Sequence, residues 1–286
     1  MCNIPPLEQI SFDVLGLHLA AQRWHRGGVP VIALHGWLDN SNSFSLLAPE
    51  MPHVDLVALD MAGHGMSSHR AAHASYLIWD DFREILAVAD QLSWQRFGLL
   101  GHSRGAIIAA LLAAAMPERI TALGLIDGLW AQTTEAAQTP TQIANALRAE
   151  NSSKPARCYA SLDDMTQQRQ RHGFPISTEA AHRLTQRNAV QGDDGQWRWR
   201  TDVRLRIPSL MRLTPEQLDA CHRAIAVPTE LRLAQQGLVQ AYPDYAERLL
   251  ALPQISWSVH AGSHHLHMEG AQSILGQVYN LFFQRL

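Results

Sequence analysis

The chain has 286 residues, of which 47% are hydrophobic and 17% charged, and its formal net charge is -3. This composition is typical of a globular protein, and the small negative charge gives no electrostatic case for a nucleic acid or an anionic membrane surface as partner. No apolar run reaches the ~20 residues that span a bilayer, and the N-terminal residues lack the basic and apolar regions of a secretory signal. The cysteines are 3 in number and widely spaced, which argues against a disulfide framework or a zinc site, so we expect a cytoplasmic protein.

The first half of the chain alternates predicted strands and helices. Strands are predicted where short apolar runs are bounded by turn residues, and helices where apolar residues recur at helical spacing. In chain order these elements are a hairpin over 8–26 that turns near Gly16, strands over 31–34 and 54–59, a helix over 76–92, a strand over 97–100, a helix over 106–116 and a strand over 120–126. This alternation predicts a mostly parallel, doubly wound sheet of the α/β class.

The composition changes after Trp130, where glutamine, arginine and threonine become more frequent. This stretch holds predicted helices over 143–150 and 179–188 and a strand over 197–200, and sheet-like runs resume over 226–233 and 255–259 before a last helix over 271–286. We therefore expect a core formed by residues 1–129 and 226–286 and an inserted lid, or cap, formed by residues 130–225. The lid is expected over the carboxyl edge of the sheet, where α/β sheets bind ligands.

The most informative stretch is Gly101-His102-Ser103-Arg104-Gly105, which stands between a predicted strand and a predicted helix. The pattern Gly-x-Ser-x-Gly in this context is typical of a nucleophile elbow, a sharp turn that presents the serine hydroxyl. The two glycines leave room for the adjacent strand and helix. Ser103 is therefore the candidate nucleophile.

A serine hydroxyl needs a base that removes its proton as it attacks, and after an elbow of this type the base comes last in the chain. The loop after the last predicted strand carries three histidines, His264, His265 and His267. His264 comes soonest after the strand and is the preferred base, and the other two are expected to be packing or hydrogen-bonded neighbours. A metal site at His265-x-His267 is not favoured, because no matching carboxylate or cysteine cluster accompanies the pair.

The acid must be a carboxylate beside the histidine, because it orients the imidazole and stabilises the imidazolium. The loop after the strand over 226–233, where this acid is commonly found, holds no carboxylate, and the next acidic residue is Asp244. Asp127 follows the strand next after the elbow strand and shares a sheet edge with Ser103. Asp127 is therefore preferred to Asp244, with a loop-capping role as its structural alternative.

The tetrahedral intermediate of acyl transfer needs two N–H donors for its oxyanion. The natural donors are the amide of the residue after the nucleophile, Arg104, and an amide in the loop after the first central strand, where Gly36 favours close approach and Trp37 donates. His35 and Asp60 are interpreted as scaffold residues that tie their loops.

Four short motifs follow one another along the chain. In order they are His35-Gly36-Trp37, Asp60-x-x-Gly63-His64-Gly65-x-Ser67, Gly101-His102-Ser103-Arg104-Gly105 and Gly262-Ser263-His264. In this order and spacing the chain resembles the α/β-hydrolase family. Within that family Leu34 to Asn40 and His264 to Met268 are similar to the serine hydrolase-like proteins. The resemblance implies an α/β-hydrolase fold, Ser103 as nucleophile and His264 as base, with no cofactor and no metal.

These observations predict a cofactor-independent serine hydrolase that cleaves a carboxylic ester or thioester through an acyl-enzyme. Carbon–carbon bond hydrolysis or other Ser/His chemistry stays an alternative, because a fold does not fix a function. A ligand-binding sensor with little turnover is a further alternative, motivated by the missing carboxylate after the strand over 226–233. Four aromatic residues of the lid suggest a small-molecule substrate with an apolar acyl or aromatic group, and lid packing explains them equally well; they are Trp130, Phe174, Trp197 and Trp199. The oligomeric state is not indicated.

Overall fold

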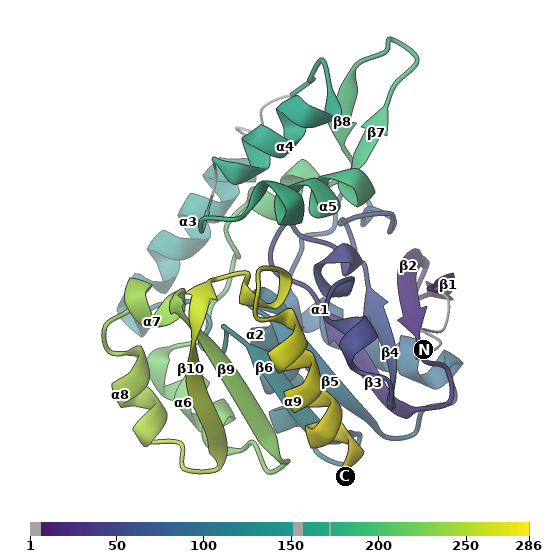
Figure 1. Ribbon diagram of the computed structural model, residues 1–286. Coiled ribbons are helices and arrows are strands. Elements are labelled where there is room, and N and C mark those ends of the chain that lie inside the picture. Colours follow the sequence, from purple (N-terminus) through teal and green to yellow (C-terminus); the bar gives the residue numbers. More distant parts are fainter. Residues whose placement is uncertain (1–6, 151–156, 172, 286) are drawn as a thin grey trace.

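The computed structural model describes residues 7–150, 157–171 and 173–285. Its centre is an 8-stranded sheet in the order β1-β2-β4-β3-β5-β6-β9-β10 (Figure 1). Strand β2 pairs antiparallel with β1 and β4, and the other neighbouring strands are parallel. The predicted mostly parallel α/β sheet is therefore confirmed.

The bounds of the elements follow the chain. The strands of the main sheet are β1 (Glu8–Val14), β2 (Leu17–Trp24), β3 (Val29–Leu34), β4 (Val54–Leu59), β5 (Phe97–His102), β6 (Ile120–Ile126), β9 (Thr229–Gln236) and β10 (Ile255–Ser263). A separate pair is formed by β7 (Ala189–Gln191) and β8 (Trp197–Trp199). The helices are α1 (Ile78–Gln91), α2 (Arg104–Ala115), α3 (Thr139–Glu150), α4 (Leu162–Gln170), α5 (Thr178–Asn188), α6 (Pro215–Arg223), α7 (Leu238–Ala241), α8 (Tyr245–Leu250) and α9 (Gln272–Gln284).

The central strands are buried on both faces, which explains their unbroken apolar sequences. In β3 the side chains alternate between two hydrophobic clusters, because successive strand residues point to opposite faces of a sheet. Ile32 and Leu34 pack in the cluster that includes residues of α1 and α2, whereas Val31 and Ala33 pack in the cluster that includes residues of α9. Figure 1 shows these helices on opposite faces of the sheet, which makes the core a three-layer structure.

The sequence predictions miss several helices between residues 157 and 250. Helix α4 buries only Met165 and Thr166, and its remaining residues are mostly polar, so no apolar stripe marks it. Helices α7 and α8 are only 4 and 6 residues long, too short to show a periodicity. Strands β9 and β10 also extend beyond their predicted ends, through polar residues that a hydrophobic pattern does not mark.

Residues 130–225 contribute α3 to α6 and the β7–β8 pair, and Figure 1 shows α4, α5 and this pair beyond one edge of the sheet. Two side chains from the loop after β3 attach α5 there. Asn40 Nδ2 donates to the carbonyl of Leu184 at 2.8 Å, and Asn42 Nδ2 donates to that of Arg183 at 2.7 Å. The segment therefore contacts the carboxyl edge of the sheet. Among the described helices, none is long and apolar enough to cross a membrane.

Candidate active site

Ser103 lies between the end of β5 and the start of α2, with backbone angles φ 52 and ψ -116. A non-glycine residue in this region is strained and persists only where its surroundings fix it. The adjacent glycines make the turn possible. A Cβ at Gly105 would lie 2.0 Å from the carbonyl oxygen of Leu34, and one at Gly101 would lie 2.4 Å from the Cα of Ala106. The turn has the geometry that a nucleophile elbow requires.

His264 and Asp127 lie together at the same edge of the sheet. His264 Nδ1 donates to Asp127 Oδ2 at 2.5 Å, and both side chains are buried. A carboxylate accepts and does not donate, so this bond leaves Nε2 of the neutral imidazole free to accept a proton. The structure therefore brings the preferred base and the preferred acid into direct contact.

The carboxylate of Asp127 is fixed by backbone amides near the end of β9 and at the start of α7. Its oxygens accept hydrogen bonds from the amides of Ala234 at 2.9 Å and Leu238 at 3.1 Å. A Cβ at Gly237 would lie 2.1 Å from Asp127 Oδ2, so only a glycine fits there. Asp244 is exposed at the start of α8, and no hydrogen bond joins it to His264 in the described part of the chain.

His102 connects the elbow to the loop that carries His264. Its Nε2 donates to the carbonyl oxygen of His264 at 2.9 Å, and the two ring centroids are 4.7 Å apart. Because His102 directly precedes Ser103, this bond places the candidate nucleophile and base on adjoining segments. Within the described ranges no hydrogen bond joins the Ser103 hydroxyl to His264, and catalytic hydrogen bonds often form fully only when substrate binds.

Of the two predicted oxyanion donors, Arg104 lies in the elbow and Trp37 in the loop after β3. Arg104 is the first residue of α2, where backbone N–H groups have no partner within the helix, and its guanidinium donates to Asp81 at 2.6 Å. The indole Nε1 of Trp37 donates to the carbonyl of Leu205 at 3.0 Å, which ties the loop after β3 to residues 130–225. For the residues the structure describes, the amides of Trp37 and Arg104 donate to no protein acceptor.

His35 and Asp60 hold loops, in agreement with their scaffold interpretation. His35 Nδ1 donates to the carbonyl of Gly36 at 2.7 Å, and its Nε2 accepts from the amide of Met61 at 3.1 Å. Burial lowers the pKa of His35, which keeps the ring neutral for this pair of bonds. Asp60 accepts from the amide of Ser41 and pairs with Arg187 of α5 at 2.9 Å.

The other two histidines of the loop lie beside His102. His265 Nε2 donates to Asp39 Oδ2 at 3.2 Å, and His267 Nε2 is 2.7 Å from the hydroxyl oxygen of Ser43. Burial lowers the pKa of His102, His265 and His267. His265 and His267 are therefore hydrogen-bonded neighbours of the site, as expected from the sequence.

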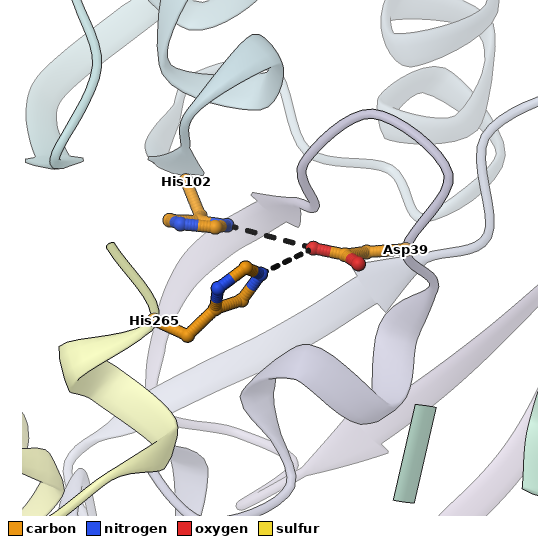
Figure 2. Close-up of side chains that lie close together, drawn as sticks. All are labelled: Asp39, His102 and His265. Carbon is orange, nitrogen blue, oxygen red and sulfur yellow. Dashed lines mark hydrogen bonds and ion pairs between the residues drawn. The ribbon is translucent and has the colours of Figure 1, made fainter. Parts of the chain in front are cut away.

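Asp39, His102 and His265 point toward one another from three separate segments (Figure 2). One donor atom from each lies within 4.8 Å of the others, a spacing that suits a metal ion. However, Arg169 Nη2 donates to Asp39 Oδ1 at 2.7 Å, so a guanidinium already supplies the positive charge beside this carboxylate. The donor set therefore fits an ion pair better than a metal centre.

The sequence interpretation missed Asp39 and Arg169, whereas Phe174 is one of the four aromatic residues that it named for the lid. The ring centroids of Phe174 and His264 are 4.2 Å apart, and the two ring planes are inclined by 31°. A cavity of about 380 Å³ adjoins it, lined by Phe174, Pro175, Gln236, Gly237, Gln240 and Ala241. The position of Asp39 two residues after the His35-Gly36-Trp37 motif is the one signal in the sequence.

The remaining aromatic residues of the 130–225 segment pack elsewhere. Trp130 contacts Tyr245 and His222, and Trp199 packs edge-on against Tyr159. Trp197 is partly buried in the same small cluster as Tyr159. Of the four, Phe174 contacts His264, and the others are explained by packing.

Comparisons with known proteins identify the family of this fold. The sequence profile of the alpha/beta hydrolase fold matches residues 29–199. The chain is 27% identical to a serine hydrolase-like protein of Dictyostelium discoideum over 97% of this chain and 82% of that protein, and 34% identical to serine hydrolase-like protein 2 of Homo sapiens over 65% and 61%. A solved structure of a hypothetical protein from Pseudomonas aeruginosa PAO1 is 44% identical, with a TM-score of 0.93 over 96% of this chain and 99% of that chain. A thioesterase domain from the curacin biosynthetic pathway, 24% identical over 96% and 99%, has the same fold with a TM-score of 0.82. The chain therefore belongs to the α/β hydrolase family and is similar within it to the serine hydrolase-like proteins.

Proposed function

We propose that this α/β hydrolase cleaves a carboxylic ester or thioester of a small molecule through an acyl-enzyme, without a cofactor. Ser103 is the nucleophile, His264 the general base and then acid, and Asp127 the residue that orients His264. The observation that carries the proposal is the 2.5 Å hydrogen bond from His264 Nδ1 to a fully buried Asp127, at the sheet edge where β5 ends in the strained Ser103.

In the first half-reaction the Ser103 hydroxyl oxygen attacks the substrate carbonyl carbon while His264 Nε2 takes its proton. The carbonyl oxygen becomes an oxyanion, which the amides of Trp37 and Arg104 stabilise. Loss of one such donor typically costs about 3–4 kcal/mol of transition-state stabilisation. His264 then returns the proton to the departing alcohol or thiol. Water attacks the acyl-Ser103 by the same proton transfers and releases the acid.

Asp127 makes this exchange possible because it holds the imidazole in one tautomer and stabilises the imidazolium that forms. Its contacts also weaken the sensor alternative. That alternative is motivated by the absence of a carboxylate directly after residue 233, and Asp127 supplies a carboxylate that bonds to the amides of Ala234, near the end of β9, and Leu238, at the start of α7.

We assign residues 130–225 to a cap and residues 1–129 and 226–286 to the hydrolase core. In support, α5 is hydrogen-bonded to the loop after β3, and Phe174 lies against the His264 ring. The cavity beside Phe174 is lined by uncharged residues, which suits an apolar acyl or aromatic group. A thioesterase domain and an esterase of Mycobacterium tuberculosis share the fold of this chain.

The test is a series of nitrophenyl esters of graded acyl length, with matched thioesters, assayed on wild type and Ser103→Ala. We expect turnover by wild type with an optimum in acyl length, and a loss of at least about 10⁴-fold in Ser103→Ala, because removal of one triad member typically costs about 10⁴- to 10⁶-fold. Turnover that survives Ser103→Ala unchanged would remove Ser103 from the mechanism.

A further inference from the structure

A buried polar cluster joins residues 130–225 to the loop that carries the candidate base. Asp39, only 1% exposed, accepts at Oδ1 from Arg169 of α4 and at Oδ2 from His265. Arg169 Nη2 also comes within 3.3 Å of His265 Nε2. Three segments that are far apart in sequence therefore meet at one carboxylate (Figure 2 shows two of them).

The cluster borders both residues that would move the proton. His265 directly follows His264, so a bond that fixes the His265 ring restrains the backbone of the base. His102, whose Nδ1 is 3.8 Å from Asp39 Oδ2, donates through Nε2 to the carbonyl of His264 and directly precedes Ser103. A shift of Asp39 would therefore act on the segments of both Ser103 and His264.

The charges in the cluster are matched. Burial alone would raise the pKa of Asp39, but the positive charge of Arg169 and the neighbouring imidazoles outweigh it and hold that pKa well below its usual value. A buried carboxylate that loses its cation must find a new partner, which means that the surrounding side chains rearrange. The Arg169 side chain is 16% exposed and that of Asp39 is 2% exposed, so water cannot readily replace the guanidinium.

We propose that Arg169 and Asp39 are positioning residues, which set the orientation of His264 through His265 and His102. Catalysis then depends on the position of α4, the helix that carries Arg169. This inference rests on the proposed function, because it needs His264 to act as the base. Neither residue touches the reacting atoms; both act through the residues adjacent to them. Since a displacement of about 1 Å in a catalytic group can cost about 100-fold in rate, a small shift of this cluster is sufficient to reduce turnover.

The experiment compares Arg169→Met, Arg169→Lys and Asp39→Asn with wild type on the nitrophenyl ester that wild type hydrolyses fastest. Arg183→Met is the matched control, because Arg183 lies on the neighbouring helix α5 and pairs on the surface with Glu179. For each variant kcat, KM, the rate of labelling by a fluorophosphonate and the thermal unfolding midpoint are measured.

We expect Arg169→Met and Asp39→Asn to lower kcat and the labelling rate by about 10- to 100-fold, with KM changed less than about threefold. Arg169→Lys, which keeps one N–H donor for Asp39 Oδ1, should recover most of the loss, and Arg183→Met should match wild type. If Arg169→Met fails to fold, Asp39→Asn, whose side chain has nearly the shape of the aspartate, decides the question by its kcat and KM, and Arg169→Lys is the variant that keeps the charge.

The proposal is overturned if kcat of Asp39→Asn and Arg169→Met stays within about twofold of wild type, if only KM rises, or if the lysine variant is no better than the methionine variant. These outcomes leave the proposed function intact. If the wild-type protein neither hydrolyses the esters nor is labelled by the fluorophosphonate, the proposed function is overturned, and this inference with it.

Discussion

At the scale of single residues, the site depends on a carboxylate that stands one strand away from the place where such an acid is commonly found. Asp127 has a positive φ of 39, a conformation that aspartate tolerates better than most residues. The amides of Ala234 and Leu238 and the imidazole of His264 account for its carboxylate oxygens. The carboxylate of the proposed acid is therefore held by the segment in which such an acid is commonly found.

We expect Asp127→Asn to lower kcat by several orders of magnitude, because an amide can hold the imidazole in the wrong tautomer; the same change in a serine protease costs ~10⁴-fold. Asp244→Asn, in the exposed residue before α8, should stay close to wild type. The measurement is kcat and KM for both variants on one nitrophenyl ester. If instead Asp244→Asn is the damaged variant, Asp127 is not the acid of the triad.

At the scale of elements, α5 is joined to the core by a buried ion pair of its own, besides the Arg169–Asp39 pair of α4. Arg187 Nε lies 2.9 Å from Asp60 Oδ2 and 3.0 Å from Oδ1, and the side chains are 5% and 0% exposed. Asp60 also accepts from the amides of Ser41 and Met66, which order the loops after β3 and β4. This pair and the Arg169–Asp39 pair both connect residues 130–225 to loops at the carboxyl edge of the sheet.

Arg187→Met should destabilise the protein by about 3–5 kcal/mol, because it leaves a buried carboxylate without its cation. Urea unfolding at neutral pH measures the change in the free energy of unfolding. Arg183→Met, which breaks an exposed pair with Glu179, is the control and should cost at most about 1 kcal/mol. Equal losses in the two variants would show that the buried pair has no special role.

The sequence predicts the core elements well because each central strand is buried on both faces and so has a continuous apolar run. The same applies to the elbow, whose glycines are required by contacts with the adjacent strand and helix. The ion pairs of α4 and α5 could not be predicted. Arg169 and Arg187 pair with carboxylates that lie 130 and 127 residues away in the sequence, and no pattern in either helix indicates these partners. The choice of Asp127 over Asp244 could be made from topology, but the role of Gly237 could not.

At the scale of the whole molecule, several histidines are buried in the core, and burial disfavours their charged form. Burial lowers the pKa of His222 to about 4, and it also lowers the pKa values of further histidines spread through the core, namely His35, His64, His102 and His267. Below pH ~6.5 the unfolded chain binds protons that the folded chain resists, so acid favours unfolding. The free energy of unfolding should therefore fall as the pH drops from about 6.5 toward the folded-state values.

His222→Gln should reduce this dependence. The lowered pKa of His222 corresponds to as much as about 3 kcal/mol of stability lost between pH ~6.5 and ~4. Urea unfolding at pH 7 and pH 4.5 is compared for wild type, His222→Gln and the exposed His53→Gln. We expect the free energy of unfolding to fall less between pH 7 and pH 4.5 in His222→Gln than in the other two proteins. Identical falls in all three would show that His222 does not contribute to the pH dependence.

The account as a whole depends on Ser103 being an activated nucleophile. The most direct measurement is incubation with a fluorophosphonate, followed by intact-mass analysis and peptide mapping of wild type and His264→Gln. We predict one phosphonyl group on wild type, located on Ser103, and labelling at least about 100-fold slower in His264→Gln. An unlabelled wild type, a label on another residue, or equal labelling of the two proteins would contradict the central claim.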